Sequence, residues 1–170
     1  IGIEESDIQR FGWPIDDGLF CEAFDRLNAS SVDVIGFDIY RDKGVGPDQQ
    51  CLRDRFQNEP TLVSIFNVAS GIGPVPGTPA ERQSYNDLSL DADGILRRDL
   101  VHVTGQDEAT VSFALRVMEI ATSDRSLRQA MDDGTHKDAW LSATGGGYYH
   151  AVDAGVGLQR LLRVRDPWSY

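Results

Sequence analysis

The sequence predicts an α/β fold: a single domain with a mixed, mostly parallel central sheet that is flanked by helices. Two observations predict this fold. Short runs rich in β-branched and aromatic residues alternate along the chain with segments whose apolar residues recur at helical spacing. The length of 170 residues and the apolar content of 41% are typical of one globular domain. We therefore expect residues 1–170 to form one domain.

The two ends of the chain are expected to be truncated. The opening "IGIEE" has apolar residues at alternate positions and predicts a first strand that has lost its beginning. The end "VRDPWSY" stops before any terminating signal. No apolar run approaches the ~18 residues of a membrane-spanning helix, and no basic-then-apolar signal peptide precedes the first strand. We expect a piece of a larger protein.

A helix over residues 16–29 and a strand after it are the next predicted elements. Asp16 or Asp17 can cap the helix, and five apolar residues share one of its faces: Leu19, Phe20, Ala23, Phe24 and Leu27. The stretch "VDVIGFDIY" is rich in β-branched and aromatic residues and predicts a central strand that ends near Asp38. Together with the first strand, these elements predict a βαβ unit.

The middle of the chain continues the alternation. Leu52 and Phe56 form the inward pair of a helix predicted over residues 48–58, and "TLVSIFNVA" predicts a third strand. The following "SGIGPVPGTPAERQ" carries three Gly and three Pro, so we expect a long surface loop there.

An antiparallel hairpin is predicted around Asp91–Gly94. "SYNDLSL" and "GILRRDLVHV" both have strand character, and the Asp and Gly between them suit a tight turn. The same D-x-D-G could begin a calcium loop, but Arg97 and Arg98 next to it disfavour a dication. We favour the hairpin turn and expect no metal.

The last third is predicted to hold a helix in "DEATVSFALRVMEIA", beginning near Asp107. "SDRSLRQAMDDG" predicts a further short helix, "ATGGGYYHAVDAG" a loop and "GLQRLLRV" a late strand.

Charge and motifs exclude several function classes. A formal net charge of −11 and scattered basic residues argue against nucleic acid as a partner. Neither "GIGPVPG" nor "TGGGYY" has the frame of a nucleotide-binding loop, so we expect no cofactor. There is no G-x-S-x-G elbow, and neither cysteine has a histidine at local motif distance. We find no catalytic set.

Five residues are candidates for a ligand-binding site or a structural clamp: Glu4, Asp38, Asp93, Arg97 and Arg98. Glu4 and Asp38 are expected at the carboxyl ends of the first two strands, where open α/β sheets place their ligand crevices. We expect Arg97 or Arg98 to reach across the sheet end toward these carboxylates. An alternative is that Glu4, Asp38 and Arg97 form the crevice of a small α/β enzyme.

Most of the chain resembles the CHASE domain of type two, a family of extracytoplasmic sensor domains in bacterial membrane receptors. The resemblance rests on Gly12-Trp13-Pro14, on the strand end Phe37-Asp38-Ile39, and on Asp91-x-Asp93-Gly94 followed by Arg97-Arg98. It implies a location outside the cytoplasmic membrane, with transmembrane helices flanking the domain. It also implies a cytoplasmic output domain such as an adenylate cyclase, a diguanylate cyclase or a kinase.

The resemblance favours a non-catalytic sensory module over an enzyme. Its expected partners are an unknown small ligand or stress signal and the flanking membrane helices, and a homodimer is a candidate assembly.

Cys21 and Cys51 are either free thiols or one disulfide. An extracytoplasmic location would permit the bond, and the two helices that carry the cysteines are neighbours if their crossovers have the same hand. Cysteine is also commonly buried as a plain small apolar residue, so two free thiols are the default expectation.

Overall fold

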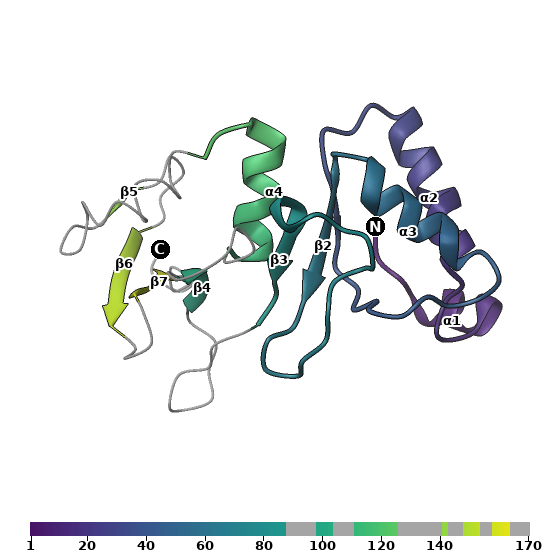
Figure 1. Ribbon diagram of the computed structural model, residues 1–170, viewed down its shortest axis with the longest axis horizontal. Coiled ribbons are helices and arrows are strands. Elements are labelled where there is room, and N and C mark those ends of the chain that lie inside the picture. Colours follow the sequence, from purple (N-terminus) through teal and green to yellow (C-terminus); the bar gives the residue numbers. More distant parts are fainter. Residues whose placement is uncertain (88–97, 104–110, 126–140, 143–147, 154–157, 164–170) are drawn as a thin grey trace.

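The computed structural model describes residues 1–87, 98–103, 111–125, 141–142, 148–153 and 158–163 (Figure 1). Its helices and strands, in chain order, are α1 (Glu5–Phe11), α2 (Asp17–Ala29), β1 (Ile35–Phe37), α3 (Gln49–Asn58), β2 (Leu62–Phe66), a 3₁₀ helix (Ala80–Arg82), β3 (Gln83–Tyr85), β4 (Arg98–Val103), α4 (Phe113–Thr122), β5 (Leu141–Ser142), β6 (Tyr148–Asp153) and β7 (Leu158–Arg163).

The central sheet is three-stranded and parallel, with the strand order β1-β2-β3. Ile35 pairs with Leu62, and Ser64 pairs with Gln83, so β2 lies in the middle. The connection from β1 to β2 runs through α3, because parallel neighbours need a crossover segment to return the chain to the same end of the sheet. The predicted parallel arrangement is confirmed for these strands.

Helices cover both faces of this sheet: α2 and α3 lie on one face and α4 on the other (Figure 1). Successive residues of β1 face opposite sides of the sheet. Ile35 and Phe37 pack into the core under α2 and α3, whereas Gly36 between them faces α4. A Cβ at Gly36 would lie 2.6 Å from the ring of Phe113, so only glycine allows α4 to approach this closely. The predicted α/β class is confirmed.

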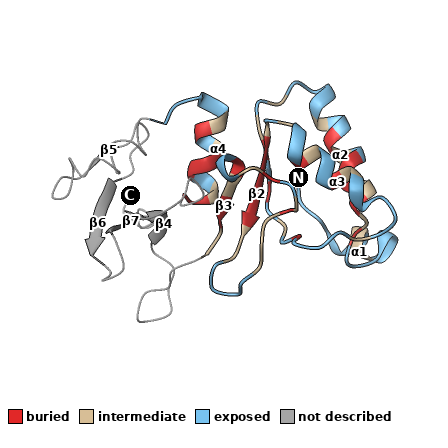
Figure 2. Cartoon of the chain, viewed as in Figure 1, coloured by how far each residue is buried: buried red, intermediate tan, exposed pale blue. Residues whose placement is uncertain are grey.

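Aromatic rings fill the layer between the sheet and the helix pair α2 and α3. The ring centroid of Phe37 lies 5.0 Å from that of Phe20 and 5.5 Å from that of Phe56. Figure 2 shows the buried residues gathered on the strands and on the inward faces of the helices. Leu52 and Leu62 complete this core with exposed fractions of 1% and 0%. The predicted inward pair of α3, Leu52 and Phe56, is confirmed.

A second sheet is antiparallel and has the strand order β4-β7-β6-β5. The late strand predicted in "GLQRLLRV" is confirmed as β7. The predicted loop "ATGGGYYHAVDAG" is wrong over Tyr148–Asp153, which form β6 and pair along their whole length with β7. The aromatic and β-branched residues in "YYHAVD" favour a strand once a partner is present.

The predicted hairpin around Asp91–Gly94 is not seen in the described part of the chain. The strands on either side of the turn belong to different sheets, because β3 pairs in parallel with β2 and β4 pairs with β7. The turn itself lies outside the described residues, as do Asp93 and Arg97.

The predicted first strand in "IGIEE" is wrong. Residues 1–4 form no strand, and α1 follows them directly. The reason is a capping interaction: the Asp7 carboxylate accepts a hydrogen bond from the backbone N–H of Glu4 at 2.9 Å and so starts a helix. Ile1 and Ile3 are both exposed, and neither pairs with a strand in the described part of the chain.

The predicted helices over residues 16–29 and 48–58 are confirmed as α2 and α3. The third predicted helix is confirmed as α4 but begins later, at Phe113, where the Ser112 hydroxyl accepts a hydrogen bond from Leu115 N–H at 3.3 Å. Its predicted start at Asp107 lies outside the described residues, as does most of the predicted short helix after α4.

Candidate functional site

The sequence-predicted site residues lie in different surroundings. Asp38 directly follows β1, at the expected carboxyl end of the sheet. Glu4 does not end a strand but occupies the N-cap of α1 and is exposed, which removes the reason for placing it beside Asp38. Arg98 begins β4, and its side chain lies outside the described part, as do Asp93 and Arg97. The carboxylate–arginine clamp stays a prediction.

A polar residue follows each strand of the parallel sheet directly: Asp38 after β1, Asn67 after β2 and Asn86 after β3. Asn86 Nδ2 donates to Asp38 Oδ1 at 2.7 Å. Tyr40 links the loop after β2 to the end of β3. Its hydroxyl accepts from Asn67 Nδ2 at 3.0 Å and donates to the Asn86 carbonyl at 3.4 Å. The carboxyl edge of the sheet therefore carries one connected polar network.

Asp87 fastens the loop after β2 to the end of β3. Its carboxylate accepts hydrogen bonds from the backbone N–H groups of Val68 at 2.9 Å and Ala69 at 3.1 Å. The adjacent Asn67 Oδ1 accepts from Ser70 N–H at 2.6 Å. These interactions fix the loop conformation, so the network holds the edge loops in place.

A cavity of about 120 Å³ lies beside this edge, between the N-termini of α2 and α3. Both helices run antiparallel to the strands, so their N-termini reach the carboxyl edge, where α/β sheets bind their ligands. The floor is buried and formed by Asp17, Arg41, Leu52 and Val75. Gln49, Gln50 and Arg53 form the exposed rim.

Asp17 and Arg41 form an ion pair at the floor of the cavity, with exposed side-chain fractions of 1% and 4%. The Asp17 Oδ1 to Arg41 Nε distance is 3.5 Å, and neither of these two atoms has a hydrogen-bond partner in the described part of the chain. Asp17 Oδ2 accepts from Val45 N–H at 3.0 Å, and Arg41 Nη2 donates to the Ile15 carbonyl at 2.9 Å. Both side chains are therefore anchored, and their remaining polar atoms, Asp17 Oδ1 and Arg41 Nε, face each other at ion-pair distance.

Burial raises the pKa of the Asp17 carboxyl above its ordinary value. The hydrogen bond from Val45 N–H and the charge of Arg41 act in the opposite direction, and the neighbouring charge of Asp16 adds to the rise. The hydrogen bond from Val45 and the charge of Arg41 thus offset only part of the cost of burying the negative charge of Asp17.

Sequence reasoning considered Asp17 only as a helix cap and did not consider Arg41. The structure separates the two adjacent acids: Asp16 caps α2 by accepting from Gly18 N–H at 2.7 Å, and Asp17 turns into the interior. A second acid directly after a capping acid, in a first helical turn that must face the core, is the signal that could have identified Asp17. Nothing in the local sequence identifies Arg41 as its partner.

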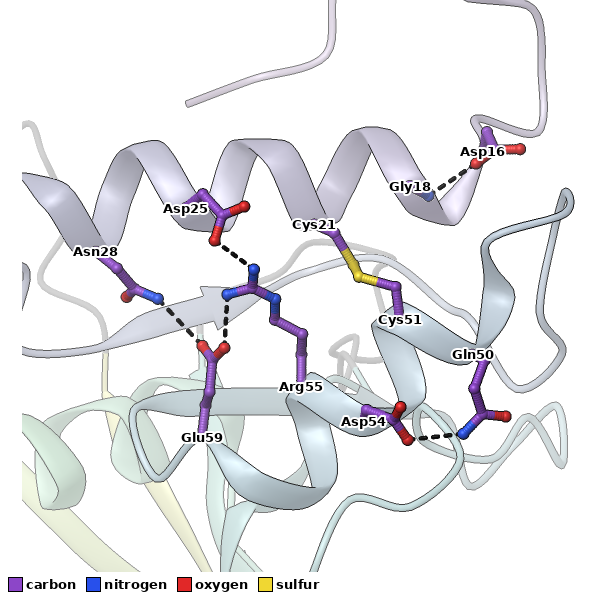
Figure 3. Close-up of a disulfide and its surroundings, with 10 residues drawn as sticks. All are labelled: Asp16, Gly18, Cys21, Asp25, Asn28, Gln50, Cys51, Asp54, Arg55 and Glu59. Atoms are coloured by element: carbon purple, nitrogen blue, oxygen red, sulfur yellow. Dashed lines mark hydrogen bonds and ion pairs between the residues drawn. A yellow bond between two sulfur atoms is a disulfide. The ribbon is translucent and has the colours of Figure 1, made fainter.

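Three side-chain contacts fasten α2 to α3 or its C-cap (Figure 3). Cys21 and Cys51 form a disulfide with a Cα–Cα distance of 6.6 Å, so the default expectation of free thiols is wrong and the alternative is correct. One turn further along, Arg55 pairs with Asp25 of α2 and, at 2.6 Å, with Glu59, the C-cap residue of α3. The Glu59 carboxylate also accepts from Asn28 Nδ2 of α2 at 3.2 Å. The two helices therefore form a linked pair whose N-termini border the cavity.

Within the described residues, no group of three or more His, Cys, Asp and Glu side chains is placed to hold a metal ion. No helix in the same part of the chain is long and apolar enough to cross a membrane.

Comparison with protein families gives one match: the CHASE2 domain, over residues 1–166. No curated protein and no solved structure matches the chain. CHASE2 domains are extracytoplasmic, sense extracellular signals and are not catalytic. The Cys21–Cys51 disulfide fits an oxidising compartment. Because the match covers nearly the whole length, the chain belongs to the CHASE2 family of extracytoplasmic sensor domains.

Proposed function

We propose that this domain is the sensory part of a transmembrane receptor and relays a signal through flanking membrane helices to a cytoplasmic output domain. The observation that carries the proposal is the family match over residues 1–166. The output is an adenylate cyclase, a diguanylate cyclase or a kinase, and the receptor works as a homodimer.

The arrangement of α2 and α3 supports a sensory role. The disulfide and the Arg55 ion pairs hold the helices together, so an event at their N-termini moves them as one unit. The β1–α3 loop carries Arg41 and lies against both the cavity and the polar edge network. A ligand that binds one arrangement of these loops more tightly than another shifts the population toward that arrangement.

The location is tested with the full-length protein in growing cells. Cells are quenched with acid, and thiols are labelled with a polyethylene-glycol maleimide before or after reduction. We expect Cys21 and Cys51 to react only after reduction, because an extracytoplasmic compartment maintains the disulfide. Labelling of both thiols without reduction would show a reducing compartment and contradict the proposal.

The relay is tested first on the full-length gene. We expect hydrophobic segments of membrane-spanning length on both sides of residues 1–170 and a cytoplasmic catalytic domain. A gene that encodes neither would contradict the receptor function.

A further inference from the structure

We infer that Asp17 makes the docking of the β1–α3 loop onto the start of α2 depend on pH, so that acidification holds the loop closed and neutral pH loosens it. The loop comprises residues 38–48. The inference rests on the proposed sensory function and deepens it, because it names the proton as a stimulus to which the domain responds.

The first step concerns the contact between the loop and α2. The Val45 carbonyl accepts a hydrogen bond from the backbone N–H of Asp17 at 3.0 Å, and the Val45 N–H donates to Asp17 Oδ2 at 3.0 Å. Only the second of these bonds uses an ionisable group. From the same loop, Arg41 Nη2 donates to the Ile15 carbonyl at 2.9 Å. The carboxyl group of Asp17 therefore takes a direct part in holding the loop.

The second step concerns the freedom of the loop to open. Gly44 and Gly46 stand on either side of Val45, and glycine adopts many backbone conformations at little steric cost. Residues 42–44 and 46–48 are exposed, and Val45 is only half-buried. Segments with few buried apolar groups open locally without unfolding the domain. This part of the loop can therefore leave α2 while the apolar core stays intact.

The third step concerns the cost of burying the Asp17 carboxylate, whose side chain is 1% exposed. Its Oδ2 accepts the hydrogen bond from Val45, and its Oδ1 faces Arg41 Nε at 3.5 Å without a hydrogen bond from the described residues. One hydrogen bond and one ion-pair contact replace only part of the water that a carboxylate loses. Burial accordingly raises the pKa of Asp17. Docking is therefore easier for the neutral carboxyl than for the charged one.

The fourth step concerns the other charges around this carboxyl. Arg41 from the loop attracts a negative charge at Asp17, and Asp16 at the start of α2 repels it. From α3, Arg53 lines the same cavity, and the N-cap residue Asp48 lies against the first turn of α2. Two of these groups favour the charged carboxyl and two favour the neutral one, so the loss of water on burial decides the direction.

The fifth step links the proton to the position of the loop. In the open loop Asp17 meets water and has the ordinary pKa of an aspartate, whereas in the closed loop its pKa is raised. The proton therefore binds the closed loop more tightly, and the closed population grows as the pH falls through the window between the two values. Local opening also gives the proton access to the buried group.

The position of the loop affects the carboxyl edge of the sheet. Tyr40 belongs to the same loop, and its hydroxyl contacts Asn67 Nδ2 and the Asn86 carbonyl. Opening or closing of the loop is thus transmitted to the polar network that joins the ends of the parallel strands.

The test is amide hydrogen exchange of the protein between pH 7 and pH 4, expressed as protection factors so that the intrinsic effect of pH is removed. The Val45 amide donates to Asp17 Oδ2 and reports the docking contact directly. We expect its protection factor to rise about two-fold or more as the pH falls, relative to the amides of the middle strand β2, which report global unfolding. Carbon-detected NMR of the Asp17 carboxyl should show its titration over the same pH range.

Asp17→Asn is the decisive variant, because it keeps the shape of the side chain and an acceptor for Val45 but does not titrate. We expect the protection of Val45, relative to β2, to lose its dependence on pH in this variant. Asp16→Asn is the matched control: it removes the neighbouring carboxyl, and asparagine is an equally good helix cap. We expect this control to keep the dependence on pH. Thermal unfolding of each variant checks that it is folded.

Two outcomes would overturn the inference. The first is a wild-type Val45 protection factor that stays constant or falls as the pH falls, and this comparison needs no variant. The second is a dependence on pH that persists in folded Asp17→Asn. The maleimide test of location is independent of both measurements. Protection that does not depend on pH, together with an oxidised Cys21–Cys51 pair in cells, would remove the proton as a stimulus and leave the extracytoplasmic location standing.

Discussion

Asp16 and Asp17 are neighbours in the sequence but have different environments. Asp16 ends the turn before α2 and caps it, whereas Asp17 is taken into the interior beside Arg41. Gly46 makes the arrangement possible: its φ of +83° suits glycine, and a Cβ there would lie 1.6 Å from Asp16 Oδ2. The loop can thus approach the start of α2 closely enough for Val45 to bind Asp17.

The raised pKa of Asp17 predicts how stability depends on pH. Between its unfolded and its higher folded pKa, the folded state binds more protons, so the contribution of Asp17 to stability falls as the pH rises through this window. We therefore expect the stability of the wild type minus that of Asp17→Asn to become more favourable as the pH falls from 7 toward 4.

Urea unfolding of both proteins at several pH values measures this difference, and the other carboxyl groups cancel in it. Asp33→Asn is the control for the loss of a carboxylate at an exposed position. A pH-independent difference for Asp17→Asn would show that burial does not perturb this carboxyl.

Among the elements, the C-terminus of α3 depends on an arginine from a distant segment. Arg82 is 6% exposed, and its Nη2 donates to the Gln57 carbonyl at 2.9 Å. Its Nη1 donates to the carbonyls of Glu59 and, at 3.4 Å, of Leu62. The last carbonyls of a helix have no partner within it, so Arg82 supplies donors that link α3 to the start of β2. Burial lowers the pKa of this guanidinium, which nevertheless stays charged.

Arg82→Met should therefore destabilise the domain by about 2–4 kcal/mol, because buried carbonyls lose their donors while the apolar volume is kept. The stability of Arg82→Lys should lie between those of the wild type and Arg82→Met, since an ammonium cannot reach several carbonyls in the fixed geometry of a guanidinium. Urea unfolding measures the loss, with the exposed Arg26→Ala as the control. Equal stability of Arg82→Met and wild type would mean that water replaces these bonds without cost.

The elements with a strong apolar period were predictable from the sequence. The helices over Asp17–Ala29 and Gln49–Asn58 and the strands inside "VDVIGFDIY" and "TLVSIFNVA" follow from local spacing, because one face or the whole strand must be buried. The N-terminal prediction failed because two isoleucines carried it, and a capping acid at Asp7 had the stronger local effect. β6 was missed because its glycine-rich approach suggested a loop.

The sequence could locate only those site residues that directly follow a strand. Asp38 was placed at the carboxyl edge correctly, and the same rule applied to the residues after β2 and β3 would have found Asn67 and Asn86. The Asp17–Arg41 pair joins segments 24 residues apart and depends on how the β1–α3 loop folds over α2. Such a pairing has no local period, so it required the tertiary structure.

At the scale of the whole molecule, the chain combines two different sheets. The parallel sheet is covered by helices on both faces and holds the polar edge and the cavity, whereas β4, β5, β6 and β7 form an antiparallel sheet from the later part of the chain. The candidate site belongs to the first of these, because only parallel strands bring their carboxyl ends together at one edge.

The disulfide links this edge to the stability of the whole domain. It closes a sequence separation of 30 residues, and in the chain-entropy model such a loop contributes about 3–4 kcal/mol by restricting the unfolded chain. Cys21 lies one turn after Asp17, and Cys51 directly follows Gln50, so the bond also fixes the distance between the two sides of the cavity. Cys21→Ser/Cys51→Ser should therefore be less stable than the wild type.

Urea unfolding of this double variant and of the wild type, each with and without reductant, separates the bond from the substitutions. We expect reductant to destabilise the wild type by most of the difference and to leave the variant unchanged. If the variant instead matched the oxidised wild type in stability, the Arg55–Asp25 ion pair, the Asn28–Glu59 hydrogen bond and the packing of Phe24 against Phe56 would suffice to hold α2 against α3.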